Sequence, residues 1–135
     1  MDRDAVAAEL SAALEREPEV VAAWLFGSWA RNAATASSDV DVAILATSPR
    51  ASASDLAFRR IELADALAAR VERHVDLVDI AQAPADLVHR VLRDGVLLID
   101  RDRSVRLRFE VDARNRYFDM QPVWREYRRS TARTS

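Results

Sequence analysis

Two aspartates interrupt an apolar run of this chain, and they constrain its fold more than any other feature. Asp39 and Asp41 stand one residue apart in Ser-Asp-Val-Asp-Val-Ala-Ile-Leu. Buried charges without a partner are rare, and alternate residues of a strand project from one face. A strand over 39–46 therefore places both carboxylates on one face and the alternate aliphatic side chains in the core. Carboxylates this close repel each other unless a cation lies between them, and oxygen ligands of this kind suit Mg²⁺.

A Gly-Ser pair precedes these aspartates, with ten residues between Ser28 and the first of them. The pair ends an apolar run over 20–26 that predicts an earlier strand. Gly27 allows close backbone approach, and the N–H groups of the following turn, with the Ser28 hydroxyl, suit the phosphates of a nucleotide. Arg31 lies one turn further on, where its guanidinium can reach the same phosphates. Without the aspartates, the pair would indicate an ordinary turn, and a surface role for Arg31 remains an equal alternative.

Metal-assisted phosphoryl or nucleotidyl transfer needs at least one more carboxylate, which also accepts the proton of the attacking hydroxyl. A third strand predicted over 75–80 supplies two candidates, Asp76 and Asp79. Alternation puts them on opposite faces, so only one of them can face Asp39 and Asp41. The position of Asp76 within the apolar part of the strand favours Asp76. We expect Asp79 to cap the strand end or to accept a hydrogen bond.

The remaining patterns predict one domain over residues 1–135 with helices and strands in alternation. A flexible connection is expected at 47–53, and the last helix contains Pro122, which weakens it. The tail at 130–135 is expected to be disordered. The predicted elements are helices over 2–17, 55–72, 84–94 and 102–127, strands over 20–26, 39–46, 75–80 and 96–99, and a short helix or turn over 28–34.

Composition narrows the class of protein. The chain has no cysteine, which excludes a disulfide scaffold and a thiolate metal site. No apolar run is long enough to span a membrane, and the N-terminus does not resemble a signal peptide. We therefore expect a cytoplasmic protein without membrane association. A formal net charge of −2 argues against direct binding of nucleic acid.

The charge is distributed unevenly, because residues 1–100 carry ten arginines and seventeen acids, whereas residues 101–135 carry ten arginines and five acids. Five aromatic residues fall within the basic part, at Phe109, Tyr117, Phe118, Trp124 and Tyr127. A chain this short cannot easily bury all of them. The C-terminal helix is therefore a candidate surface for a protein partner. A solvated amphipathic helix that packs on the sheet is an equal alternative.

The order Gly-Ser, spacer, Asp-x-Asp resembles the signature of the nucleotidyltransferase superfamily of the DNA polymerase β type. The small size resembles the minimal nucleotidyltransferases, in particular the MntA-type antitoxins that are paired with HEPN-domain toxins. Two later segments are also similar to that subgroup, Arg93-Asp-Gly-Val-Leu-Leu-Ile-Asp and Phe109-Glu-Val-Asp-Ala-Arg to Tyr117-Phe-Asp-Met. Asn32 departs from the pattern, since many relatives have glycine there. Asparagine tolerates left-handed backbone, so we expect the turn to be kept.

This resemblance implies an α/β (α+β) nucleotidyltransferase core, a mixed sheet of three to four strands with helices mainly on one face. It implies a Mg²⁺-dependent enzyme that moves AMP from ATP to a hydroxyl. The implied acceptor is a tyrosine of a cognate HEPN toxin ribonuclease, which the modification neutralises, and antitoxin and toxin are expected to form a hetero-oligomer. The implied metal and catalytic residues are Asp39, Asp41 and Asp76, and the implied nucleotide-binding residues are Gly27, Ser28 and Arg31.

Two other functions fit the same residues. The first is a small-molecule nucleotidyltransferase of the aminoglycoside-modifying kind, although such enzymes are larger and carry a second helical region. The second is a non-catalytic antitoxin that neutralises its toxin by contact alone. The presence of all three acids argues against this second function, because a site that has lost its activity usually loses an acid.

Overall fold

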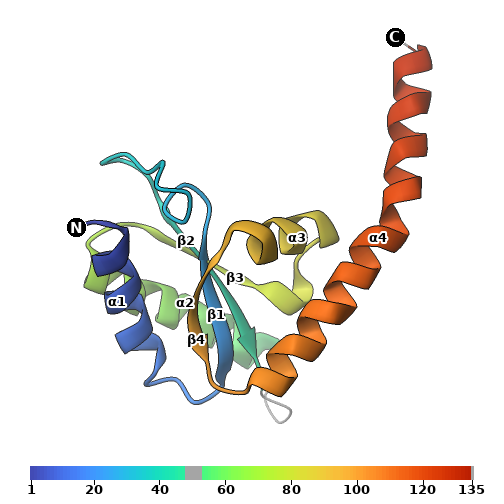
Figure 1. The fold of residues 1–135 in the computed structure, drawn as a ribbon. Coiled ribbons are helices and arrows are strands. Elements are labelled where there is room, and N and C mark those ends of the chain that lie inside the picture. The colour runs from blue at the N-terminus through green and yellow to red at the C-terminus, as the bar shows by residue number, and fades with distance from the viewer. Residues whose placement is uncertain (48–52, 135) are drawn as a thin grey trace.

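The computed structural model describes the chain over residues 1–47 and 53–134, and the side chains over 1–47 and 59–122. Helices and strands follow one another in the predicted order, and a turn joins the first two strands directly (Figure 1). The expected connection at 47–53 lies outside the described residues apart from its two ends. The elements are α1 (Arg3–Leu14), β1 (Val20–Phe26), β2 (Val40–Ala46), α2 (Ala53–Val71), β3 (Val75–Asp79), the 3₁₀ helix η1 (Ile80–Gln82), α3 (Ala85–Asp94), β4 (Val96–Asp100) and α4 (Arg103–Thr134).

The four strands form one mixed sheet in the order β3-β2-β1-β4. β1 lies between β2 and β4 and is antiparallel to both. β2 and β3 are parallel, and α2 makes the crossover between them. This order brings the end of β1, with its Gly-Ser pair, next to the start of β2, with its aspartates. β3 then adds a second line of acidic residues beside β2.

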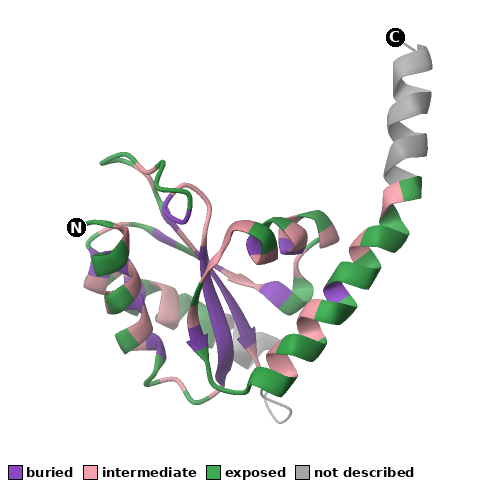
Figure 2. Cartoon of the chain, viewed as in Figure 1, coloured by how far each residue is buried: buried purple, intermediate pink, exposed green. Residues whose placement is uncertain are grey.

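Helices cover both faces of the sheet, which corrects the expectation that they lie mainly on one. One core packs α1 and α2 against alternate residues of the strands, including Ala23 and Leu25 of β1. A second core packs α3 and α4 against the other face, including Ala22 and Trp24 of the same strand. The strand is apolar at every position, so both of its faces must be covered. Figures 1 and 2 show the buried strands between the two helical layers.

The last helix is longer than predicted. It begins at Arg103, continues past Pro122 and includes residues 130–134, where we expected a disordered tail. Its first part packs beside α3 and its later part projects away from the sheet (Figure 1). The side chains of Trp124 and Tyr127 lie outside the described residues. Among the described residues, no helix is both long enough and apolar enough to cross a membrane.

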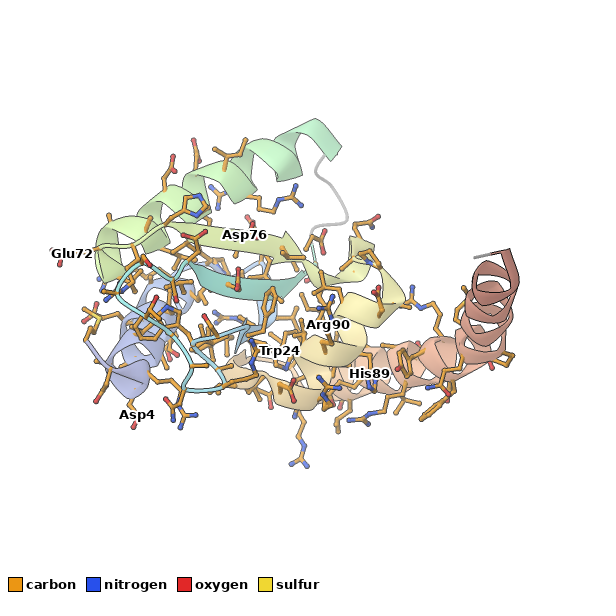
Figure 3. The ribbon with its side chains drawn as sticks, turned by 90° about the horizontal axis from the view of Figure 1, so that it is seen from above. Asp4, Trp24, Glu72, Asp76, His89 and Arg90 are labelled. Carbon is orange, nitrogen blue, oxygen red and sulfur yellow. The ribbon has the colours of Figure 1, made fainter. Side chains whose placement is uncertain are left out.

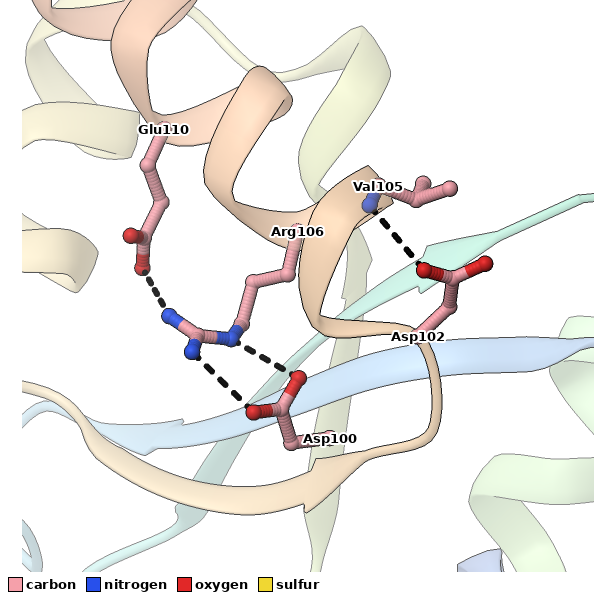
Figure 4. Close-up of polar contacts among 5 residues, drawn as sticks. All are labelled: Asp100, Asp102, Val105, Arg106 and Glu110. Carbon is pink, nitrogen blue, oxygen red and sulfur yellow. Dashed lines mark hydrogen bonds and ion pairs between the residues drawn. The ribbon is translucent and has the colours of Figure 1, made fainter.

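Arg106 anchors the start of α4 to the edge of the sheet (Figure 4). Its guanidinium donates two hydrogen bonds to the Asp100 carboxylate, at 2.9 and 3.0 Å, and one to Glu110 at 3.1 Å. The side chains of Arg106 and Glu110 are only 13% and 12% exposed. The hydrogen bonds from Arg106 lower the pKa of Asp100 below its ordinary value. The arginine therefore fixes the direction in which the helix leaves β4.

We expect Arg106→Met to destabilise the fold by about 1–2 kcal/mol at neutral pH, because charge-assisted hydrogen bonds are lost and solvent only partly replaces them. The lowered pKa of Asp100 means that this stabilisation is present above the ordinary value of 3.8 and is lost as the pH falls through the folded-state pKa. Urea unfolding at pH 7 and pH 3 measures both effects. Arg108→Met, at an exposed position of the same helix, is the control. An equal loss in both variants would contradict the anchoring role.

Candidate functional site

The register between β2 and β3 brings predicted acids side by side. Val40 pairs with Val75 and Asp41 pairs with Asp76. Paired residues of neighbouring strands project from the same face of a sheet, so Asp41 and Asp76 (the latter labelled in Figure 3) stand together. This is the face that α3 and α4 cover, since Ala43 belongs to their core. Asp39 precedes β2 on the same face, at an exposed position.

Gly27 closes this group of acids from the side of β1. Its backbone is left-handed, with φ of 73°, a conformation that glycine adopts without strain. A Cβ at this position would overlap the Oδ2 atom of Asp41. Both observations require glycine. The Gly-Ser turn and the Asp41 carboxylate are therefore in direct contact, although ten residues separate Ser28 from Asp39 in the sequence.

The chain after Gly27 forms a turn over residues 27–32 rather than a helix. Arg31 N–H donates to the Gly27 carbonyl at 3.3 Å, and Ala33 N–H donates to the Ser28 carbonyl at 2.8 Å. Asn32 has φ of 56°, which confirms the expectation that asparagine adopts left-handed backbone in this turn. The turn carries Arg31 close enough to Asp41 for its positive charge to oppose, without cancelling, the rise in the pKa of that carboxyl that burial causes.

The charges around Asp41 are not balanced. Burial raises the pKa of Asp41 above its ordinary value of 3.8, and the negative charges of Asp76 and Asp39 raise it further. Arg31 and His74 act in the opposite direction, but the net shift is upward. A carboxylate that is partly buried beside two others is a site for a cation or a proton. The protein thus concentrates negative charge at one point of the sheet.

His74 is a further neighbour of these acids, directly before the strand predicted over 75–80. Its Nδ1 atom lies 3.6 Å from Oδ2 of Asp39. The Val40 N–H donates to the His74 carbonyl at 2.9 Å, so the pairing of β2 and β3 continues to these two residues. The sequence holds a signal for this contact. His74-Val75-Asp76 repeats the spacing of Asp39-Val40-Asp41, and the parallel register aligns the two.

Residues 8–104 match the family model described as "Polymerase beta, Nucleotidyltransferase". The chain belongs to this family. Its fold is that of a nucleotidyltransferase, with four helices around a four-stranded mixed sheet. The matched region contains both the Gly-Ser turn and the acids on β2 and β3. No curated protein matches the chain significantly.

Solved structures of toxin–antitoxin systems share this nucleotidyltransferase fold. A crystal structure described as "the toxin-antitoxin with AMP-PNP" contains a chain that is 26% identical, with a TM-score of 0.77, and the match covers 93% of this chain and 98% of that one. A mutant of the toxin-antitoxin MntA-HpeT gives 28% identity and a TM-score of 0.71, over 90% and 93% of the two chains. A Shewanella oneidensis structure of a tri-AMPylated HEPN toxin with its MNT antitoxin gives 24% identity, a TM-score of 0.73 and coverage of 96% and 98%.

Asp79 lies apart from the acids of this nucleotidyltransferase. It pairs with Ile44, whose side chain is in the core on the opposite face. Its Oδ1 atom accepts a hydrogen bond from Ala81 N–H at 3.1 Å and caps the 3₁₀ helix that follows β3. The expectation that Asp79 accepts a hydrogen bond at the strand end is confirmed.

The donor set of the nucleotidyltransferase suits a hard divalent cation, because three carboxylates share one face and raise the pKa of the central one. Their side chains do not converge, however. Among the described residues, no group of three or more histidine, aspartate or glutamate side chains is arranged to hold a metal ion. Asp39 lies beside His74 instead. The three acids therefore share one face of the sheet, and the assignment of all three as metal ligands stays a prediction.

Proposed function

We propose that this nucleotidyltransferase moves AMP from ATP to a hydroxyl group with Mg²⁺ as cofactor. The observation that carries the proposal is the register of β2 and β3, which aligns Asp41 with Asp76 beside the Gly-Ser turn. The crystal structure described with AMP-PNP, whose chain is 26% identical, supports ATP as the nucleotide. We also propose a cytoplasmic location, and one minimal nucleotidyltransferase domain over residues 1–135.

In this proposal Asp39, Asp41 and Asp76 would hold the metal, which would neutralise charge on the triphosphate. The turn at Gly27 and Ser28 binds the phosphates through its N–H groups and the serine hydroxyl, assisted by Arg31. The oxygen of the acceptor hydroxyl forms a bond to the α-phosphorus, and the bond from that phosphorus to the pyrophosphate oxygen breaks. Asp76 takes the proton of the hydroxyl, and pyrophosphate leaves.

We propose a tyrosine of a HEPN-family toxin as the acceptor and neutralisation of that toxin as the result. Chains of two toxin–antitoxin structures share the fold at 26% and 28% identity. The AMPylated HEPN toxin in the Shewanella oneidensis complex suggests the modification, while its likeness at 24% identity concerns the fold alone. A hetero-oligomer of the two proteins would bring the acceptor to the small domain as part of a folded partner.

The test combines the chain with its partner toxin, α-labelled ATP and Mg²⁺. We expect label on the toxin and a mass increase of one or more AMP groups at tyrosine, together with loss of ribonuclease activity. The matched control is Asp41→Asn, which should bind the toxin without labelling it. Full inhibition by Asp41→Asn would favour neutralisation by contact alone. Label on an aminoglycoside instead of the toxin would favour the small-molecule enzyme.

The exposed face of α4 is the surface that we propose for the toxin. Leu107, Val111, Phe118 and Met120 project from the described part of this helix, between 36% and 60% exposed. The first three recur at helical spacing on one face. Other aromatic residues of the helix have partners within the fold, since Phe109 joins the core and the Tyr117 ring stacks on His89 at 3.7 Å. One face of α4 thus packs on the rest of the fold, and the opposite face is exposed and free to bind a partner.

We expect Phe118→Asp to weaken the complex with the toxin by roughly 2 kcal/mol, the effect of an interface hot spot. ATP binding should be unchanged, because Phe118 is not part of the nucleotide site. Calorimetry with toxin and with ATP separates the two effects. Ile61→Asp is the matched control, since Ile61 is 62% exposed on α2, which packs on the opposite face of the sheet. Normal toxin binding by Phe118→Asp would show that this face serves another purpose.

A further inference from the structure

A cavity lies on the other side of the Gly-Ser turn from the acids. It has a volume of about 300 Å³ and is bounded by the start of α1, the loop that follows the turn, and the connection from α2 to β3. Trp29 lines it and belongs to the core with α1 and α2, whereas Asp41 lies on the face of α3 and α4. Figure 1 shows the N-terminus beside the loop between β1 and β2. None of the three acids lines this cavity.

The cavity is rich in hydrogen-bond donors that carry positive charge. Arg3 and Arg73 both line it. Among the described residues, Arg3 donates one hydrogen bond, from NH1 to the Ala30 carbonyl at 3.2 Å, and approaches Asp4 at 3.8 Å. Arg73 donates one, from NH1 to the Ala36 carbonyl at 2.6 Å. Most N–H groups of both guanidiniums therefore remain for a ligand.

One acid also lines the cavity, but its role is structural. The Asp2 carboxylate accepts a hydrogen bond from Ala5 N–H at 2.8 Å and caps α1. Two guanidiniums against one carboxylate leave a positive surplus. This contrasts with the rest of a chain whose first hundred residues carry ten arginines and seventeen acids. Two forked cations at one cavity are a common arrangement for recognition of a phosphate group.

Trp29 provides an independent observation. Its side chain is buried, and its indole N–H has no hydrogen-bond partner among the described residues. A buried donor without a partner is unfavourable and calls for an explanation. The Arg73 guanidinium lies over the indole ring, 4.9 Å from its centroid. Since Trp29 and Arg73 both line the cavity, an acceptor bound there would lie next to the indole and to the guanidinium that covers it.

We infer that this cavity, lined by Arg3, Arg73 and Trp29, binds a phosphate group of a free phosphate or nucleotide, separately from the nucleotide at the catalytic acids. The loop between β1 and β2 contributes both to this cavity and to the catalytic acids' surroundings. Its first residue, Gly27, lies against Asp41, and its later residues line the cavity. A ligand that orders this loop would also order the turn that faces Asp41. The inference rests on the proposed function in one respect, because that function identifies Asp39, Asp41 and Asp76 as the catalytic acids.

The test uses the full chain labelled with ¹⁵N and titrated in EDTA, so that no divalent cation links phosphate to the catalytic acids. The probes are inorganic pyrophosphate, AMP and adenosine, and the signal is the indole N–H resonance of Trp29, assigned with Trp29→Phe. We expect a saturable shift with pyrophosphate or AMP and none with adenosine. Arg73→Gln and Arg3→Gln should each weaken binding at least tenfold. If one of them does not fold, the other decides the outcome.

Arg31→Gln is the matched control, because it removes a guanidinium from the catalytic side of the same loop. We expect it to bind pyrophosphate as the wild type does. Absence of a saturable shift, or equal binding by Arg73→Gln and Arg3→Gln, would overturn the inference. Loss of binding in Arg31→Gln with normal binding in the other two would also overturn it, since the anion would then occupy the catalytic side.

Discussion

Asp41→Asn is expected to abolish nucleotidyl transfer while the fold remains intact. The asparagine has nearly the same shape and fits beside Gly27 in place of the carboxylate that contacts it. Metal ligation by the central acid is lost, and with it several kcal/mol of transition-state stabilisation. Since about 1.4 kcal/mol corresponds to a factor of ten, the rate should fall by at least about 10³-fold. Asp39→Asn should act in the same way.

The same variant tests the charge balance of the site through its stability. Because the pKa of Asp41 is raised in the folded protein, the folded state holds the proton more tightly than the unfolded state. Stability therefore falls as the pH rises from the ordinary value of 3.8 through the raised pKa. At pH 7 without metal, Asp41→Asn should unfold at a higher temperature than the wild type. Below pH 3.8 the difference should disappear.

Thermal unfolding with Mg²⁺ and ATP provides the control for metal binding. A ligand that binds only the folded state raises its stability, so the wild type should gain stability and Asp41→Asn should gain much less. Normal turnover by a folded Asp41→Asn variant would contradict the metal site. A variant that is less stable than the wild type at pH 7 without metal would instead show that Asp41 has a favourable partner.

The β2 strand was predictable because its side chains project alternately from the two faces of the sheet. Two carboxylates within an apolar run define the direction of every side chain in β2, and the parity of β3 then separates Asp76 from Asp79. The left-handed turn at Asn32 also followed from residue type. These features depend on local sequence. Local sequence does not show that β2 pairs with β3. This tertiary contact places Asp76 beside Asp41.

Other features escaped prediction for physical reasons. The two-sided core follows from β1, which is apolar at every position, and alternation cannot tell a strand covered on both faces from a short buried helix. His74 was overlooked because its contact with Asp39 depends on a register that no single strand reveals. The cavity at Trp29 is lined by residues from three separate parts of the chain, so no local sequence motif predicts it.

Asp76→Asn should reduce the rate of transfer by roughly two to four orders of magnitude, the range of general base catalysis. Asp76 is the partner of Asp41 across the parallel strands, and it is the residue that we propose to take the proton of the hydroxyl. Its own position is exposed and its loss removes repulsion from Asp41, so the fold should tolerate the change. Single-turnover assays with toxin and labelled ATP would measure the chemical step apart from binding.

Asp79→Asn is the matched control on the same strand. It makes the same chemical change three residues away, but on the opposite face of the sheet. Asparagine caps as well as aspartate does, so the hydrogen bond from Ala81 should persist and the rate should change by less than about threefold. Equal losses in the two variants would show that the effect is one of general charge. The reverse order would mean that Asp79 serves the reaction and that the register aligning Asp76 with Asp41 is not the active one.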